Sequence, residues 1–90
     1  LEMSVRISGV ATVGAGEIVV RDLICKHFWN DGFNIHGGSA PLWFENITGV
    51  WNGDEGFSAH ENAECYVRGG YFAHNYWHGI ADITFSRTHY

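Results

Sequence analysis

The sequence predicts an all-β fold, a parallel β-solenoid, from three observations. First, the 90-residue chain aligns with itself at a shift of roughly 23 to 24 residues. Second, each repeat contains short stretches in which apolar and polar residues alternate, as they do in half-buried strands. Third, no stretch shows the apolar spacing of an amphipathic helix. A repeat this short, with two or three strands, fits one coil of a solenoid better than a hairpin meander.

Two other repeat or β architectures were weighed against the solenoid. A leucine-rich repeat has a similar period but needs several leucines per unit, and the chain has only Leu1, Leu23 and Leu42. A sandwich or small barrel of six to eight strands remains an alternative, although it would not require equivalent residues to recur at one offset. With 46% apolar and 16% aromatic residues, the chain is long enough for one globular unit and is not disordered.

The expected elements follow the repeat in order. Residues 1–17 are expected to form a partial first coil or a cap, and three coils follow at 18–41, 42–64 and 65–90. In the opening strand of each coil, the first and third residues suit a core and the fourth suits solvent. These strands are Ile18-Val19-Val20-Arg21, Leu42-Trp43-Phe44-Glu45 and Cys65-Tyr66-Val67-Arg68.

Stacking of the coils would turn equivalent residues into ladders. Arg21, Glu45 and Arg68 would form an outward ladder of alternating sign. The next column, Asp22, Asn46 and Gly69, is expected at the strand end, in a turn.

A second alternating stretch closes each coil, at 31–36, 55–60 and 78–83, and a glycine followed by an apolar residue recurs in it. In this register Asp82 would align with Ala59 and point inward. We expect a one-residue shift after Ile80 that turns Asp82 outward and brings Ile83 into the core.

Charge and composition exclude several functions. The net charge is −5 and the only lysine is Lys26, which argues against a nucleic-acid partner. No apolar run approaches the roughly 20 residues of a membrane span, so no membrane partner is expected. Cys25 and Cys65 are too few for a disulfide framework or a zinc site, and no cofactor or metal is expected. The stretch 82–90 reads as the start of another strand, so we expect a fragment of a longer β-helix that packs on the rest of its chain or self-associates.

One column of residues has the acidic and histidine side chains that cleavage of a glycosidic bond would use. Asp31, Glu55 and His78 precede the recurring glycines, and Asp54 lies beside them. Stacked carboxylates raise one another's pKa, and a protonated acid beside an ionised one can protonate a leaving oxygen and activate water. Inverting enzymes separate this pair by roughly 6.5–9.5 Å, which Asp31 and Asp54 could span. The alternative is that these are only turn residues, as in any solenoid.

Three short motifs carry a family resemblance. Asn30-Asp31-Gly32, Gly53-Asp54-Glu55 and Trp77-His78-Gly79 resemble the successive Asn-Thr-Asp, Gly-Asp-Asp and Gly-His-Gly motifs of polygalacturonase-type glycoside hydrolases, which belong to the pectin-lyase-like proteins. The resemblance implies a right-handed parallel β-helix, with Asp54 as general acid, Asp31 and Glu55 activating water and His78 supporting the acids. Glu55 stands where the family has aspartate, and the family's Arg-x-Lys motif has no counterpart in this sequence.

Exposed aromatic residues are the candidate substrate-binding groups, because indole and phenol rings stack on sugars. The candidates are Trp29, Trp51, Tyr76 and Trp77, together with His60. Packing is the alternative for Trp51 with His27 and His74, and for Trp43 and Tyr66, which would ladder with Val19.

The histidines His36 and His60 recur at one offset. With Asp54, Glu55 and Glu61 they could bind a metal, but a surface ladder is the preferred interpretation.

The sequence therefore predicts a secreted or cell-surface hydrolase acting on a polysaccharide or oligosaccharide. A polysaccharide lyase, which would need Lys26, an arginine or Ca²⁺ to neutralise a uronate, is one alternative. A non-catalytic solenoid, such as an adhesin or tail-fibre segment, is the other.

Overall fold

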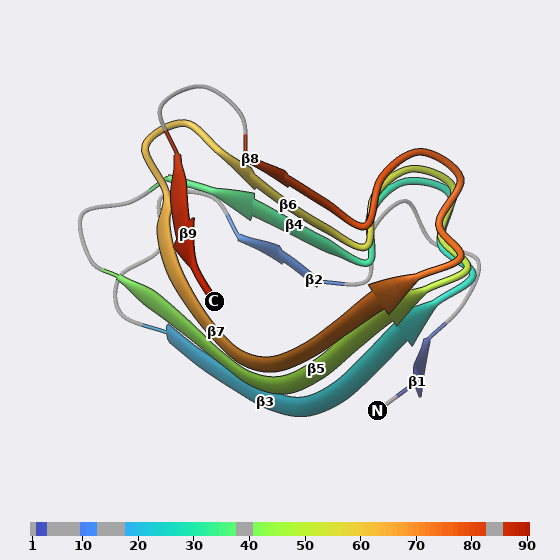
Figure 1. Ribbon diagram of the computed structural model, residues 1–90, viewed down its shortest axis with the longest axis horizontal. Helices are drawn as coiled ribbons and strands as arrows, with labels where there is room; N and C mark the ends of the chain where they lie inside the picture. Colours follow the sequence, from blue (N-terminus) through green and yellow to red (C-terminus); the bar gives the residue numbers. More distant parts are fainter. Residues whose placement is uncertain (1, 4–9, 13–17, 38–40, 83–85) are drawn as a thin grey trace.

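A computed structural model describes residues 2–3, 10–12, 18–37, 41–82 and 86–90, and in this part of the chain the fold is all-β with two parallel sheets (Figure 1). Strands along the chain alternate between the sheets. The first sheet has the order β1 (Glu2–Met3), β3 (Ile18–Lys26), β5 (Leu42–Val50), β7 (Glu64–Ala73), β9 (Arg87–His89). The second has the order β2 (Val10–Thr12), β4 (Phe33–His36), β6 (Phe57–His60), β8 (Ile80–Asp82). In the described residues no helix has the length and apolar character to cross a membrane.

The pairing register confirms the repeat found in the sequence. Ile18 pairs with Leu42, and Leu42 pairs in turn with Cys65. In the second sheet Phe33 pairs with Phe57, and Phe57 pairs with Ile80. Each residue therefore lies beside its equivalent in the next repeat, and the side chains at one repeat position form a column across the sheet.

The core lies between the two sheets and is built largely from aromatic rings. Phe33, Phe44 and Phe57 are almost fully buried. The Phe44 and Phe57 rings meet edge to face, with centroids 5.1 Å apart and planes at 86°. The predicted inward positions are confirmed at Leu42, Phe44, Cys65 and Val67, which are all buried.

The strands of the first sheet bend where a turn was expected. Asp22, Asn46 and Gly69 have φ of 54°, 51° and 70°, in the left-handed region that Asn, Asp and Gly adopt most readily. Their strands continue through them, so the expectation that this column ends the strands was wrong. The left-handed residue bends each strand instead, which gives the curved ribbons of β3, β5 and β7 (Figure 1).

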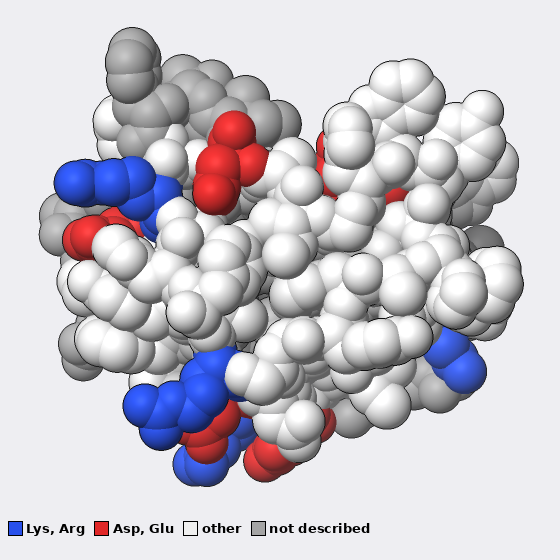
Figure 2. Space-filling view, in the orientation of Figure 1, with Lys and Arg blue, Asp and Glu red and all other residues white. Residues whose placement is uncertain are grey.

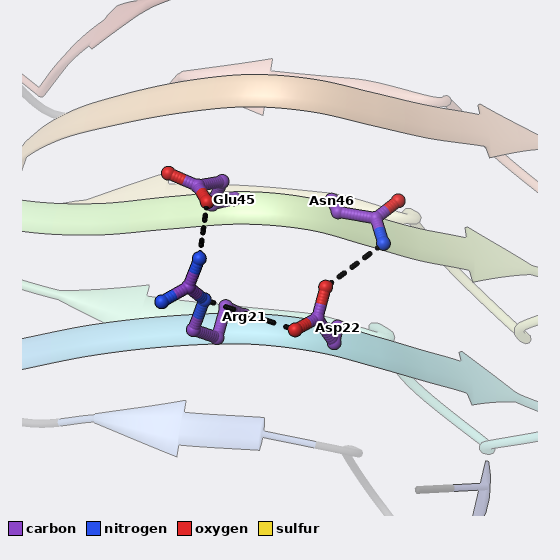
Figure 3. Close-up of polar contacts among 4 residues, drawn as sticks. All are labelled: Arg21, Asp22, Glu45 and Asn46. Atoms are coloured by element: carbon purple, nitrogen blue, oxygen red, sulfur yellow. Dashed lines mark hydrogen bonds and ion pairs between the residues drawn. The ribbon is translucent and has the colours of Figure 1, made fainter.

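Polar ladders line the outer surface of this bend (Figure 3). Arg21 Nη2 donates a hydrogen bond of 2.7 Å to Glu45 Oε1, which confirms the predicted charge ladder at its first step. Asn46 Nδ2 donates to Asp22 Oδ1 at 2.9 Å. Both contacts join side chains that the register places side by side.

Three loops, at 27–32, 51–56 and 74–79, lead from the first sheet to the second and follow one another closely (Figure 1). Backbone hydrogen bonds join successive loops, for example from Gly53 N to Phe28 O at 2.7 Å and from Tyr76 N to Asn52 O at 2.9 Å. The recurring glycine has a steric reason. A Cβ on Gly56 would lie 2.8 Å from the carbonyl oxygen of Gly79, too close for a side chain.

The two ends of the chain correct the sequence analysis in part. β1 pairs in parallel with β3, and β2 pairs in parallel with β4. The expected shift after Ile80 was wrong, because Asp82 pairs in register with Ala59. Asp82 is exposed all the same and accepts a hydrogen bond from Thr88 Oγ1. The stretch 82–90 is divided between β8 and β9, and Thr88 restarts the register beside Cys65. The expected roles of residues 5–7, 14–16 and 83 lie outside the described residues.

Candidate active site

The structure brings together the three carboxylates that the sequence analysis selected. Asp31, Asp54 and Glu55 come from two consecutive loops, and one oxygen of each lies within 4.8 Å of the others. The loop stacking explains the arrangement, because Asp54 N donates to Asn30 O at 3.1 Å and places Asp54 and Glu55 directly beside Asn30 and Asp31.

Hydrogen bonds hold the cluster in place. Asp31 and Glu55 are only 2% and 7% exposed, whereas Asp54 is partly exposed. Asp31 Oδ1 accepts a hydrogen bond of 3.1 Å from the backbone N–H of Glu55. His78, from the third loop, lies with Nδ1 3.2 Å from Glu55 Oε1. The four predicted catalytic residues therefore gather in one place, with two of them buried and two reaching solvent.

Burial controls the protonation of the cluster. Burial, reinforced by hydrogen bonds with Asp31 and Asp54, raises the pKa of Glu55 to about 7, while the hydrogen bond with His78 acts in the opposite direction. Burial also raises the pKa of Asp31, and hydrogen bonds to Glu55 oppose this change. Near neutral pH the cluster therefore holds a proton that isolated carboxyl groups would have lost.

The carboxylates lie closer together than the sequence analysis expected. Oxygens within 4.8 Å are nearer than the roughly 6.5–9.5 Å between the two carboxyl groups of inverting glycosidases. One water molecule that donates two hydrogen bonds of roughly 2.8 Å reaches acceptors about 4.5 Å apart. The spacing thus suits a single water held by two carboxylates, or a proton shared between them.

The histidine column adjoins the cluster on the outer face of the second sheet. The rings of His36 and His60 are stacked with centroids 4.7 Å apart, which is the predicted ladder. Ser58 Oγ and His60 Nε2 are 2.5 Å apart, and His36 Nδ1 lies 3.5 Å from Glu61 Oε2. Within the described residues, the one group of three metal-ligating side chains is Asp31, Asp54 and Glu55, so the histidine pair is not part of a metal-binding set.

The candidate substrate-binding aromatics differ in how free their rings are. Trp29, Tyr76 and Trp77 are 78%, 79% and 64% exposed. Trp77 meets the ring of His78 edge to face, with centroids 5.7 Å apart, which places it beside the carboxylates. Trp51 is stacked on His74 with ring centroids 4.4 Å apart, and both residues also line a pocket together with His27, so packing and cleft lining occur together.

The remaining aromatic column lies on the first sheet. Trp43 stacks on Tyr66 at 4.4 Å, and Tyr66 stacks on His89 at 4.6 Å, so the predicted ladder is confirmed. Trp43 also pairs in register with Val19.

An asparagine ladder that was not predicted from the sequence lies in the same loops. Asn52 is 3% exposed, and its amide donates to Cys25 O at 3.2 Å and to Asn75 Oδ1 at 3.0 Å. Asn75 Nδ2 in turn donates to Gly49 O at 2.9 Å. The signal was present, because an asparagine recurs at the second position of two loops, but Phe28 at the equivalent position of the first loop hides it.

The comparisons with known proteins give no relative for this chain. No family model, no curated protein and no solved structure matches it.

Proposed function

We propose that the chain hydrolyses glycosidic bonds in a polysaccharide or oligosaccharide, using Asp31, Asp54, Glu55 and His78. The observation that supports the proposal is the gathering of three carboxylates within 4.8 Å, one of them with a pKa of about 7. Glycosidic cleavage needs one protonated and one ionised carboxyl group at the same pH, and a cluster that retains one proton supplies both.

The burial of each group suggests its role. Asp54 is partly exposed and is the carboxyl group that can approach the glycosidic oxygen. A proton held on Glu55 can pass to Asp54 through the hydrogen bond between them. Asp31 and Glu55 are buried and closely spaced, so they suit the holding and deprotonation of water. His78 orients Glu55 through its hydrogen bond.

The wider proposal concerns fold and family. The two parallel sheets with a constant register support successive coils of a right-handed parallel β-helix of the pectin-lyase-like type, with the motifs of the polygalacturonase-type hydrolases. A polysaccharide substrate makes a secreted or cell-surface location the natural expectation.

Reducing-sugar release from a panel of polysaccharides tests the function. Asp54→Asn should lower the rate at least about 100-fold, the usual effect of removing a general acid. Asp22→Asn is the matched control, because it makes the same change in an exposed residue of the first sheet, and it should leave the rate unaltered. Equal rates in the wild type and Asp54→Asn would contradict the proposal.

One observation favours a second candidate function, a non-catalytic solenoid. Asp31 is buried and accepts a hydrogen bond from the backbone of the next loop, which is what a structural turn ladder requires. In that case no polysaccharide in the panel is cleaved, and Asp31→Asn alters the free energy of unfolding alone.

A further inference from the structure

A pocket of about 660 Å³ lies on the loops that also carry the carboxylate cluster, although no residue of the cluster lines it. At its rim three consecutive loops contribute one residue each at the same repeat position, namely Trp29, Gly53 and Tyr76. The middle loop has no side chain at this position. Trp29 and Tyr76 therefore lie two layers apart along the stacked loops, and the intervening Gly53 contributes only backbone.

The backbone spacing of the loops sets the space between these two residues. Neighbouring parallel segments lie roughly 4.8 Å apart, so residues two layers apart are separated by about 9.6 Å. A flat ring in van der Waals contact on both faces needs roughly 7–8 Å between the flanking groups. The spacing of about 9.6 Å is larger, so it also accommodates a puckered, saturated ring, which is thicker than a flat one. The backbone enforces the gap, because a Cβ on Gly53 would lie 2.0 Å from Trp29 O.

The exposure of the aromatic rings distinguishes this gap from the other aromatic columns. Trp29 and Tyr76 are 78% and 79% exposed. By contrast, Trp43 and Trp51 each stack on an aromatic ring of the next layer, at 4.4 Å in both cases. Among the described residues the Tyr76 ring has one aromatic neighbour, Trp77, with centroids 6.2 Å apart and planes at 19°. A ligand ring can therefore stack on Trp29 and on the face of Tyr76 that Trp77 leaves free.

The chemistry of the lining favours an uncharged ligand. The lining residues include no Asp, Glu, Lys or Arg, and they offer imidazole and amide groups that can hydrogen-bond hydroxyls. Figure 2 shows acidic atoms on both sides of the hollow at the top of the face in view, and Lys and Arg atoms at the left, lower and right edges of that face. A uronate would find no Lys or Arg among the described residues of the lining, and carboxylates on the same loops would repel it.

We propose that the gap between Trp29 and Tyr76 binds one pyranose ring of an uncharged oligosaccharide. Gly53 at the rim directly precedes Asp54 in the sequence, so the pocket and the carboxylate cluster share a loop. This inference rests on the proposed hydrolysis only in naming the site as a subsite of that reaction. Binding itself requires no cleavage, and the two can fail separately.

Isothermal titration calorimetry of the Asp54→Asn chain tests the binding. The probes are the hexasaccharides of β-1,4-glucan, xylan, mannan and β-1,3-glucan, with hexagalacturonate as the charged probe. At least one uncharged probe should bind, and hexagalacturonate should bind at least about tenfold more weakly. Trp29→Ala and Tyr76→Ala should each weaken binding at least about tenfold, and Trp29→Phe should restore most of it.

Trp43→Ala is the matched control, because it removes an exposed tryptophan from the first sheet, and it should leave binding within about twofold. Failure of every uncharged probe to bind would overturn the inference. So would binding that survives both Trp29→Ala and Tyr76→Ala, or preferential binding of hexagalacturonate. If the probes bind through these rings but wild-type protein cleaves nothing, the proposed function fails and the inference stands. If cleavage depends on Asp54 but not on Trp29 or Tyr76, the proposed function stands and the inference fails.

Discussion

His78 Nδ1 lies 3.2 Å from Glu55 Oε1, so a hydrogen bond joins an exposed ring to a carboxyl group that is 7% exposed. Burial raises the pKa of Glu55 to about 7, and the His78 contact limits the rise. The protonation of a buried carboxyl group of the site therefore depends on a side chain that solvent and substrate can reach.

The first prediction concerns stability and pH. Because the pKa of Glu55 is higher in the folded chain, about 7 against an ordinary 4.5, the folded state binds the proton more tightly than the unfolded state. The stabilisation is complete below pH 4.5 and is lost as the pH rises through about 7. The shift corresponds to roughly 3 kcal/mol at most. Thermal unfolding measured from pH 4 to pH 9 should show a falling melting temperature across this window.

Glu55→Gln is the variant that checks the cause. An amide cannot ionise, so the variant should lose much of the pH dependence and melt at a higher temperature than the wild type at pH 8. Asp31 contributes in the same direction, because burial also raises its pKa. A melting temperature that rises between pH 5 and pH 8 in the wild type would show that Glu55 is ionised throughout.

The second prediction concerns His78. Its hydrogen bond lowers the pKa of Glu55, so His78→Ala should move that pKa above about 7. A ¹³C NMR titration of the glutamate carboxyl groups measures the change directly. His74→Ala is the control, because His74 is an exposed histidine of the same loop that stacks on Trp51. A Glu55 pKa that is the same in His78→Ala and the wild type would mean that the contact is absent in solution.

The repeat made much of the fold predictable, because residues that lie one repeat apart in the sequence pair with each other in neighbouring parallel strands. Ile18, Leu42 and Cys65 were aligned from their apolar neighbours, and the structure pairs them in that order. The bend at Asn46 was not foreseen, since Asn in the left-handed region suits a turn and a bent strand equally well. The register at Asp82 was predicted wrongly because a residue that pairs with the buried Ala59 was assumed to be buried as well. Asp82 pairs with Ala59 and is nevertheless exposed.

The candidate site was predictable as a column but not in its geometry. Recurrence before a glycine selected Asp31 and Glu55, and the loop stacking brings them together. Their separation depends on how each loop closes, which no residue pattern reports. The ladder of Asn52 and Asn75 was missed because its first position is occupied by Phe28, so only two of three repeats carry the signal.

The third prediction concerns the ion pair of Arg21 and Glu45, which are 63% and 45% exposed in their side chains. Exposed pairs of this kind contribute roughly 0.2–1 kcal/mol, because water screens the charges and two long side chains lose freedom. A double-mutant cycle of Arg21→Ala and Glu45→Ala, followed by urea unfolding, should give a coupling free energy below about 1 kcal/mol that shrinks in high salt. A larger coupling free energy that does not change with salt would contradict this prediction, because it would mean that water does not screen the two charges.

The fourth prediction compares two asparagines. Asn52 is buried, and its side chain accepts a hydrogen bond from Phe28 N at 3.2 Å and donates to Cys25 O and Asn75 Oδ1. Asn52→Ala would leave several of these buried groups unpaired, so we expect a loss of about 2 to 4 kcal/mol in the free energy of unfolding. Asn46 makes its hydrogen bond to Asp22 on the exposed face. Asn46→Gly, which tolerates the positive φ of this residue, should therefore cost less than about 1 kcal/mol, although it also removes an asparagine side chain. Urea unfolding of both variants measures the difference, and equal losses would mean that the loop ladder does not hold the candidate site in place.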